Sequence, residues 1–150
     1  MTSNQLFRIL GGTAAGALLI AQFIQPDIPV PPIPKPGAGY DAVVPDTRVK
    51  AILQRACADC HSNDTVWPWY SRISPVSHLV ASDVVRGRRQ LNFSTVATIS
   101  EEQMGEIHDV INFGDMPPKA YTFMHPSAKL SKAEADLLKQ WALGELPATK

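Results

Sequence analysis

The sequence has no excess of charge of either sign, because 14 lysine and arginine residues balance 14 aspartate and glutamate residues over 150 positions. Proteins that bind nucleic acid usually carry a basic surplus, so no nucleic-acid partner is expected. Aromatic residues are also few, at 7%, which limits the core that one domain of this length can build. Such a chain usually needs a covalent or metal-based staple to be stable.

Cysteine is scarce as well. The two cysteines, Cys57 and Cys60, stand only three positions apart and are poorly placed to close a long loop by a disulfide. They are better suited to hold another group. No segment alternates convincingly between apolar and polar residues, which argues against β-strands.

An almost uncharged stretch occupies residues 1–25 and contains the run LFRILGGTAAGALLIAQFI. As a helix, positions 9–24 would span roughly 24 Å at the rise of ~1.5 Å per residue, somewhat less than a ~30 Å hydrocarbon core. We expect an uncleaved transmembrane helix in contact with membrane lipid. A cleaved signal peptide is the alternative, although no A-x-A site follows the run.

Either reading predicts export. The expected location is the bacterial inner membrane, with the N-terminus in the cytoplasm and the rest of the chain on the periplasmic side. Gly12 and Gly16 form a G-x-x-x-G pattern, which is typical of helix packing in membranes. This helix face could contact a larger membrane-embedded complex, although membrane spans are in any case rich in glycine and alanine, which explains the pattern equally well.

Proline dominates residues 26–45, PDIPVPPIPKPGAGYDAVVP. Proline fixes φ and removes a backbone donor, so neither helix nor sheet can continue here. The segment is predicted to be an extended linker of ~3.1 Å per residue. At that rise it would hold the following domain about 30 Å from its anchor.

Residues 46–150 are predicted to form an all-α domain. Apolar residues recur at helical spacing before Cys57, behind a candidate N-cap at Asp46. Two capping boxes, which begin at Ser100 and Ser131, start two further helices that end near Gly114 and Gly144. A shorter helix is expected over residues 76–86.

The segment Cys57-Ala58-Asp59-Cys60-His61 is C-x-x-C-H, the attachment signature of c-type haem. Two thiols at this spacing can bond the two vinyl groups of one porphyrin edge, and the histidine then lies under the ring. A redox dithiol would need a βαβ setting, and a structural zinc site would need four ligands. The motif therefore predicts one covalently attached haem c with His61 as an iron ligand.

The second axial ligand is less closely defined. Met116 follows a glycine turn and precedes two prolines, which can stiffen a loop that presents sulfur to iron. Met124 and His125 are the alternatives. We interpret Met104 as a core methionine and His108 as a solvated or locally paired histidine; His78 is a further candidate.

Other residues are expected to shape the pocket. Trp67, Trp69 and Tyr70 follow the motif and could wall the porphyrin or donate to a propionate, although core packing explains them equally well. The basic run over residues 86–89, and Arg88 in particular, is a candidate for binding the propionates or for docking an acidic partner; a solvated helix end is the alternative. The backbone carbonyl that accepts from His61 is expected in the turn over residues 73–75.

Four segments carry a family resemblance: CHSNDTVWPWYSRISPVSHLV, GRRQLNFS, GDMPPKAY and FMHPSAKLS. They resemble a bacterial family of haem-binding domains related to small cytochromes c, over residues 44–143. The resemblance implies a small cytochrome c-like fold with haem c on Cys57 and Cys60, His61 as proximal ligand and a matching Met-Pro segment at Met116. A tryptophan is common in the family where His78 stands.

The function expected from these features is one-electron transfer between redox protein partners, not catalysis. A histidine and methionine pair saturates the iron and raises its potential, which suits a carrier. A haem-based peroxidase or gas sensor is the alternative, and it would need an open sixth position on the iron. A binding module in which haem is only structural is a third hypothesis.

Overall fold

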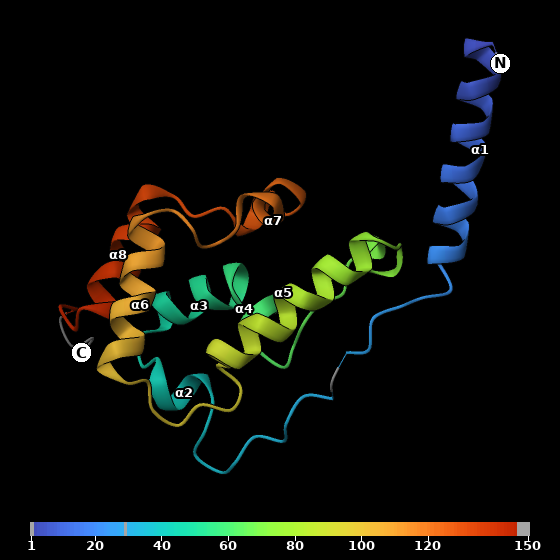
Figure 1. The fold of residues 1–150 in the computed structure, drawn as a ribbon. Helices are drawn as coiled ribbons and strands as arrows, with labels where there is room; N and C mark the ends of the chain where they lie inside the picture. Colours follow the sequence, from blue (N-terminus) through green and yellow to red (C-terminus); the bar gives the residue numbers. More distant parts are fainter. Residues whose placement is uncertain (1, 29, 147–150) are drawn as a thin grey trace.

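The computed structural model describes residues 2–28 and 30–146, and within these ranges every regular element is a helix (Figure 1). The all-α prediction is confirmed for this part of the chain. Residue 1, position 29 of the predicted linker and residues 147–150 of the predicted domain lie outside it. The elements, in chain order, are α1 (Ser3–Ala21), α2 (Tyr40–Val43), α3 (Thr47–Ala56), α4 (Ala58–His61), η1 (Trp69–Arg72), α5 (Val76–Gln90), α6 (Glu101–Asn112), α7 (Lys119–Met124), η2 (Pro126–Ala128) and α8 (Lys132–Ala142).

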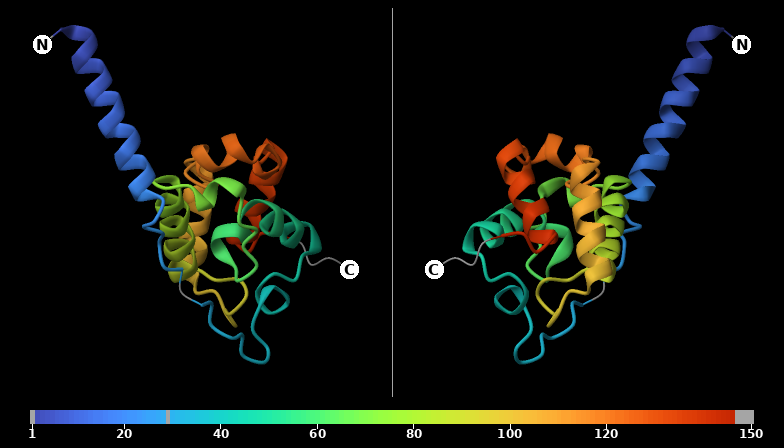
Figure 2. Two further views of the ribbon diagram at one scale, coloured as in Figure 1. Left: turned by 90° about the vertical axis from the view of Figure 1, so that its right-hand side faces the viewer. Right: turned by 90° about the vertical axis from the view of Figure 1, so that its left-hand side faces the viewer.

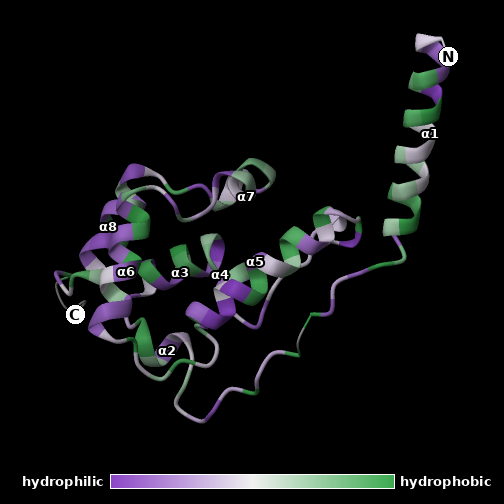
Figure 3. Ribbon diagram, viewed as in Figure 1, coloured by the Kyte–Doolittle hydropathy of each residue, from purple (hydrophilic) through white to green (hydrophobic). Residues whose placement is uncertain are grey.

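The hydrophobic core lies where α3, α6 and α8 meet. Helix α3 buries its apolar stripe, including Val49 and Leu53, and α8 contributes Leu138 and Trp141. Helix α6 packs along α8 and adds partly buried side chains such as Ile107. This arrangement leaves α4 and α5 as a second pair that packs against the end of α3 (Figures 1 and 3).

The predicted helix starts are confirmed. Asp46 caps α3, since its side chain accepts from the backbone N–H groups of Arg48 and Val49. Ser100 and Ser131 each form a complete capping box at the start of α6 and α8. These short-range bonds satisfy N–H groups that have no partner inside the helix, so they can be recognised from local sequence.

Helix α5 is one turn longer than predicted, because it continues through Gly87 to Gln90. Glycine is a poor helix former, so local preference alone disfavours continuation through Gly87. Tertiary packing overrides it here, since α5 passes close to α4 at this position. The extra turn brings the end of α5 beside the C-x-x-C-H segment.

Helix α1 projects away from the rest of the molecule and buries none of its residues (Figure 2). Among the described residues, no helix combines the length and apolar character that crossing a membrane requires. The predicted transmembrane helix is therefore not confirmed.

The proline-rich segment is extended, but it is not a free spacer. Just before this segment, at the end of α1, the Gln22 side chain bonds Ser74 twice, donating to the carbonyl oxygen over 2.9 Å and accepting from the N–H over 3.0 Å. The His78 Nε2 lies 3.0 Å from the carbonyl oxygen of Ile24, and Asn63 donates to the carbonyl of Pro32 over 2.9 Å. The predicted separation of about 30 Å between helix and domain is therefore wrong: the polar groups along the segment bind the domain surface.

Packing against the core begins inside the predicted linker. The ring of Tyr40 stacks on Phe93 at a centroid distance of 4.9 Å, and Val44 is only 1% exposed within the core cluster. The one-turn helix α2 positions Tyr40, its first residue, and Val44, which follows it directly. The core therefore includes residues that precede position 46.

The Asp46 cap provides a test of how α3 is stabilised. Hydrogen bonds from the Arg48 side chain and from backbone N–H groups lower the Asp46 pKa from 3.8 to about 2. A lowered pKa stabilises the folded chain fully above the unfolded value, and the contribution disappears as the pH falls from 3.8 towards 2. Asp46→Ala should lower the Tm at neutral pH by roughly 5 °C.

Asp46→Asn is the matched control, because asparagine also caps helices but does not titrate. It should keep most of the Tm at neutral pH and lose the part of the acid sensitivity that is due to Asp46. Thermal unfolding of the three proteins as a function of pH makes the comparison. If Asp46→Asn retained the full acid sensitivity of the parent, the pH-dependent contribution of this cap would be disproved.

Candidate functional site

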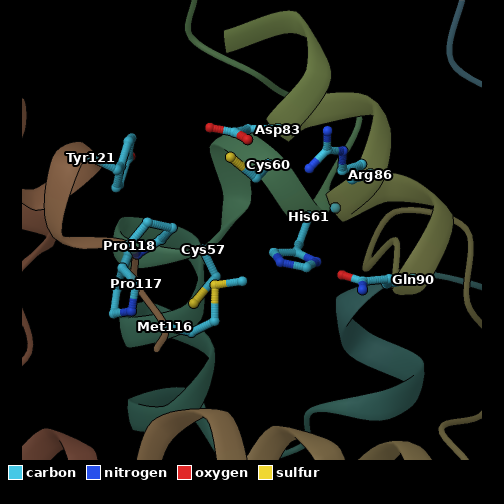
Figure 4. A pocket seen from close by; sticks show the side chains of 12 residues that line it. Cys57, Cys60, His61, Asp83, Arg86, Gln90, Met116, Pro117, Pro118 and Tyr121 are labelled. Carbon is cyan, nitrogen blue, oxygen red and sulfur yellow. The ribbon is translucent and has the colours of Figure 1, made fainter. Parts of the chain in front are cut away.

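The C-x-x-C-H segment forms a tight bend between two helices. Cys57 ends α3 and at the same time caps α4, and the single turn of α4 carries Cys60 and His61. All three side chains line one pocket (Figure 4). The bend therefore brings two sulfurs and an imidazole to the same cavity wall.

Two hydrogen bonds fix the orientation of His61. Its Nδ1 lies 3.1 Å from the carbonyl oxygen of Leu91, to which it can donate, and its own carbonyl accepts from the Phe93 N–H over 2.8 Å. With Nδ1 bonded to a carbonyl, Nε2 is the nitrogen left for a metal. The predicted acceptor in the turn over residues 73–75 is wrong: the segment after α5 supplies it, because α5 extends one turn further than expected.

The environment of these groups suits ligation more than acid–base or thiol chemistry. Burial lowers the pKa of His61, which favours the neutral imidazole that binds metals. Burial also raises the pKa of Cys57 to about 12 and that of Cys60 to about 11. Reactive dithiols have lowered thiol pKa values, so this pair is not built for thiol–disulfide exchange.

Gly87 lets α5 approach the motif. A Cβ atom at this position would lie 2.5 Å from the carbonyl oxygen of Cys60 and 3.1 Å from its Cβ. Any other residue would push α5 away from α4. The close approach also leaves Arg86, which directly precedes Gly87, and Asp83 and Gln90, which lie about one turn before and after it, along the pocket (Figure 4).

The site consists of two adjoining pockets of about 290 and 390 Å³, which share Cys57, His61, Gln90 and Met116. Volumes of this size are typical of cofactor sites. The first pocket is closed by α5 and by the segment around Pro117. The second is lined by apolar side chains of α3 and α6, including Leu53 and Ile107.

Met116 lies in a loop held against the end of α6. Gly114 turns the chain with φ +72°, and the N–H groups of Asp115 and Met116 then both donate to the carbonyl of Val110, over 2.8 and 3.1 Å. The loop places Met116 at both pockets that His61 lines. Thus the structure brings the proximal histidine and the favoured sixth-ligand candidate to one cavity.

Comparison with known proteins agrees with this geometry. The model of the haem-binding domain family matches residues 16–143. The chain belongs to the haem-binding domain family. A curated relative, the cytochrome c peroxidase Ccp of Escherichia coli (strain K12), is 26% identical over 108 residues, which are 67% of this chain and 23% of the relative. The chain thus corresponds to less than a quarter of that protein. No solved structure matches the chain.

The residues present fit a haem. The donor set combines two thiols, an imidazole with a free Nε2 and a thioether around a cavity whose walls are partly apolar. By contrast, the described residues contain no group of three or more histidine, cysteine, aspartate or glutamate side chains that could hold a metal ion on their own.

The other sixth-ligand candidates lie elsewhere. Met124 is 47% exposed, and His125 Nε2 lies 2.7 Å from the Tyr70 hydroxyl; neither residue lines the two pockets. Met104 packs against the core, and the His108 ring lies 3.0 Å from the Asp109 carboxylate, as expected. His78 contacts the N-terminal segment.

The predicted aromatic wall is not supported by the structure. Trp67, Trp69 and Tyr70 line neither pocket, and Trp69 is 73% exposed. The aromatic side chains at the pockets are those of Tyr121 and Phe93. The three predicted residues follow the motif closely in sequence, but the chain after His61 leads them away from the cavity.

Arg88 has a role different from the predicted one. Its guanidinium donates to the Ser62 carbonyl over 2.8 Å and to the Thr65 hydroxyl over 2.9 Å, so it braces the loop after His61. Arg86, from the same basic run, lines the first pocket and is the better candidate for a propionate (Figure 4). Helical spacing explains the difference, since positions 83, 86 and 90 share a face and position 88 does not.

Gln90, Asp83 and Tyr121 were not foreseen as site residues. For Asp83 and Gln90 the available signal was their spacing from Arg86 along α5. Tyr121 carried no local signal, because it reaches the pocket only through the fold of the loop that leads into α7.

The contact at Gly87 leads to a prediction. Gly87→Ala should destabilise the holoprotein by about 1–3 kcal/mol, because the added methyl group overlaps backbone atoms of Cys60 and cannot be relieved by a side-chain rotation. It should also lower the haem content per chain. Thermal unfolding and the absorbance ratio of haem to protein measure the two effects.

Gly105→Ala is the control, since a Cβ at this exposed position of α6 meets no atom within 4 Å. It should leave haem content unchanged and stabilise the protein by up to ~1 kcal/mol, because alanine is the better helix former. If the two variants had equal stability and equal haem content, the approach of α5 to α4 would contribute to neither.

Proposed function

We propose that this haem-binding domain is a monohaem c-type cytochrome that transfers single electrons between protein partners. The observation that carries the proposal is the shared cavity: Cys57, Cys60 and His61 line it from one bend, and Met116 lines it from the loop after α6. Two thiols, an imidazole and a thioether are the groups that hold a c-type haem and saturate its iron.

Each residue then has a defined task. Cys57 and Cys60 would bond the porphyrin edge, and His61 would ligate iron through Nε2 while Leu91 holds its other nitrogen. Met116 would occupy the sixth position. Bound haem supplies a one-electron couple, and histidine with methionine raises its potential.

A carrier is favoured over a catalyst because both axial positions have candidate ligands at the pocket. The similarity to a cytochrome c peroxidase supports peroxide reduction as a second candidate, although the chain corresponds to only 23% of that relative. Catalysis would require Met116 to leave the iron. A carrier unit that supplies electrons to a peroxide-reducing partner is consistent with both lines of support.

We also propose that the domain acts on the periplasmic side of a bacterial inner membrane. The motif for thioether attachment and the apolar N-terminal helix support this location. Helix α1 exposes Leu10, Leu19 and Ile20, and no other atom lies within 4 Å of a Cβ built at Gly12 or Gly16. A face of this kind can receive membrane lipid or a helix of a redox complex.

Thioether attachment makes a direct prediction. The intact mass of the purified protein should equal the chain, after any N-terminal processing, plus one haem. Acidified acetone should leave the colour with the protein, because a covalent bond survives the loss of the iron ligands. Colour that passes into the acetone would rule out bonds to Cys57 and Cys60.

The ligand assignment is tested by Met116→Ala. Ferric haem with a methionine ligand shows a weak far-red charge-transfer band, which this variant should lose, and the reduced protein should then bind carbon monoxide readily. Met124→Ala is the matched control and should behave like the parent. Loss of the band in Met124→Ala, with Met116→Ala unchanged, would reassign the ligand.

A further inference from the structure

Helix α7 follows the Met116 loop directly but is weakly held by packing. Pro118 caps it, none of its residues is buried, and Phe123 is 82% exposed. Its main neighbouring element is the short η2 that comes next in the chain. The far end of α7 is held through η2, which packs against α3, so contacts elsewhere along α7 decide how firmly the end next to Met116 is fixed.

One hydrogen bond ties α7 to the haem-attachment motif itself. The Tyr121 hydroxyl donates to Asp59 Oδ2 over 2.7 Å. Asp59 lies between the two cysteines, and it is fixed in turn: its Oδ1 accepts from the Val66 N–H over 3.0 Å and its carbonyl from the Thr65 hydroxyl over 2.6 Å. A carboxylate acceptor makes this bond stronger than a neutral one.

A second contact ties the end of the same helix to η1. His125, the C-cap of α7, has its Nε2 2.7 Å from the Tyr70 hydroxyl. The His125 ring also stacks on Tyr121, with centroids 4.5 Å apart and planes inclined by 19°. The two hydrogen bonds are therefore coupled through one pair of rings.

We propose that Asp59, Tyr70, Tyr121 and His125 form a latch that keeps Met116 at the iron. The proposal rests on the proposed function and adds its regulation. The four side chains are positioning residues: they fasten α7 to α4 and η1 while Met116, Pro117 and Pro118 lead into α7. Tyr121 itself lines the first pocket, beside Pro118 (Figure 4).

Prolines make the connection effective. Pro117 and Pro118 have fixed φ angles, so the segment between Met116 and α7 is stiff. A displacement of α7 would therefore move Met116 instead of being absorbed by the loop. With the latch closed, the domain would transfer electrons; with the latch open, the sixth position would accept a small ligand such as carbon monoxide or peroxide.

The test compares the holoprotein with Tyr121→Phe and Tyr70→Phe, each of which removes one hydroxyl and keeps the ring. Carbon monoxide binding to the reduced protein needs a free sixth position, so its association rate reports how often Met116 leaves. Each variant should raise this rate about tenfold, as expected for loss of one strong hydrogen bond in a partly exposed site. The methionine band of the oxidised protein should weaken in parallel.

Phe123→Ala is the control on the same helix, because its side chain is exposed and takes no part in the latch. It should leave the carbon monoxide association rate and the methionine band unchanged. Two separate hydroxyl variants are used so that a folding failure of one leaves the other to decide.

The outcomes separate the latch from the function on which it rests. A parent protein without the methionine band refutes the His61 and Met116 assignment. A parent with the band, together with parent-like tyrosine variants, refutes the latch alone. A rise in Phe123→Ala equal to that in the tyrosine variants also refutes it, since general loosening of α7 would then be sufficient.

Discussion

The site depends on the distance between two helices, α4 and α5, at the place where Gly87 meets the backbone of Cys60. At this spacing the end of α5 brings the Leu91 carbonyl to the His61 ring and the Phe93 N–H to the His61 carbonyl. Arg88 then reaches over the loop that follows. A motif of five residues is thus held in shape by a helix that begins fifteen positions after it.

The cavity and the hydrophobic core share side chains. Leu53, Ile107 and Ile111 belong to the core formed by α3, α6 and α8 and also line the second pocket. A haem bound there would extend the core of a chain that is poor in aromatic residues. The contacts of the haem with these side chains and with its iron ligands would exist only in the folded state, so they would stabilise the fold.

The sequence was informative wherever the deciding interaction is local. Asp46, Ser100 and Ser131 bond groups within three residues, and the C-x-x-C-H spacing carries its own chemistry, so the helix starts and the placement of three site residues at one cavity could be foreseen. Contacts between segments that are distant in the sequence could not be foreseen. The pairing of His61 with Leu91 spans 30 positions, and that of Tyr121 with Asp59 spans 62. The prediction that the helix ends at residue 86 missed Gly87, whose role depends on its approach to Cys60 in another helix. Trp69 was predicted to wall the pocket because it follows the motif closely in sequence, but nearness in sequence is not nearness in space.

The hydrogen bonds from Gln22 to Ser74 and from His78 to Ile24 have a consequence for how the domain would meet a partner. A haem domain on a loose tether takes many orientations, so in most encounters a face other than the haem site meets the partner. Here the end of α1 is fastened beside the start of α5, the helix whose far end borders the cavity. Rotation about the proline-rich segment is therefore restricted, and the opening of the cavity keeps a fixed orientation relative to α1. Any surface that binds α1 would therefore also set the orientation of the haem site.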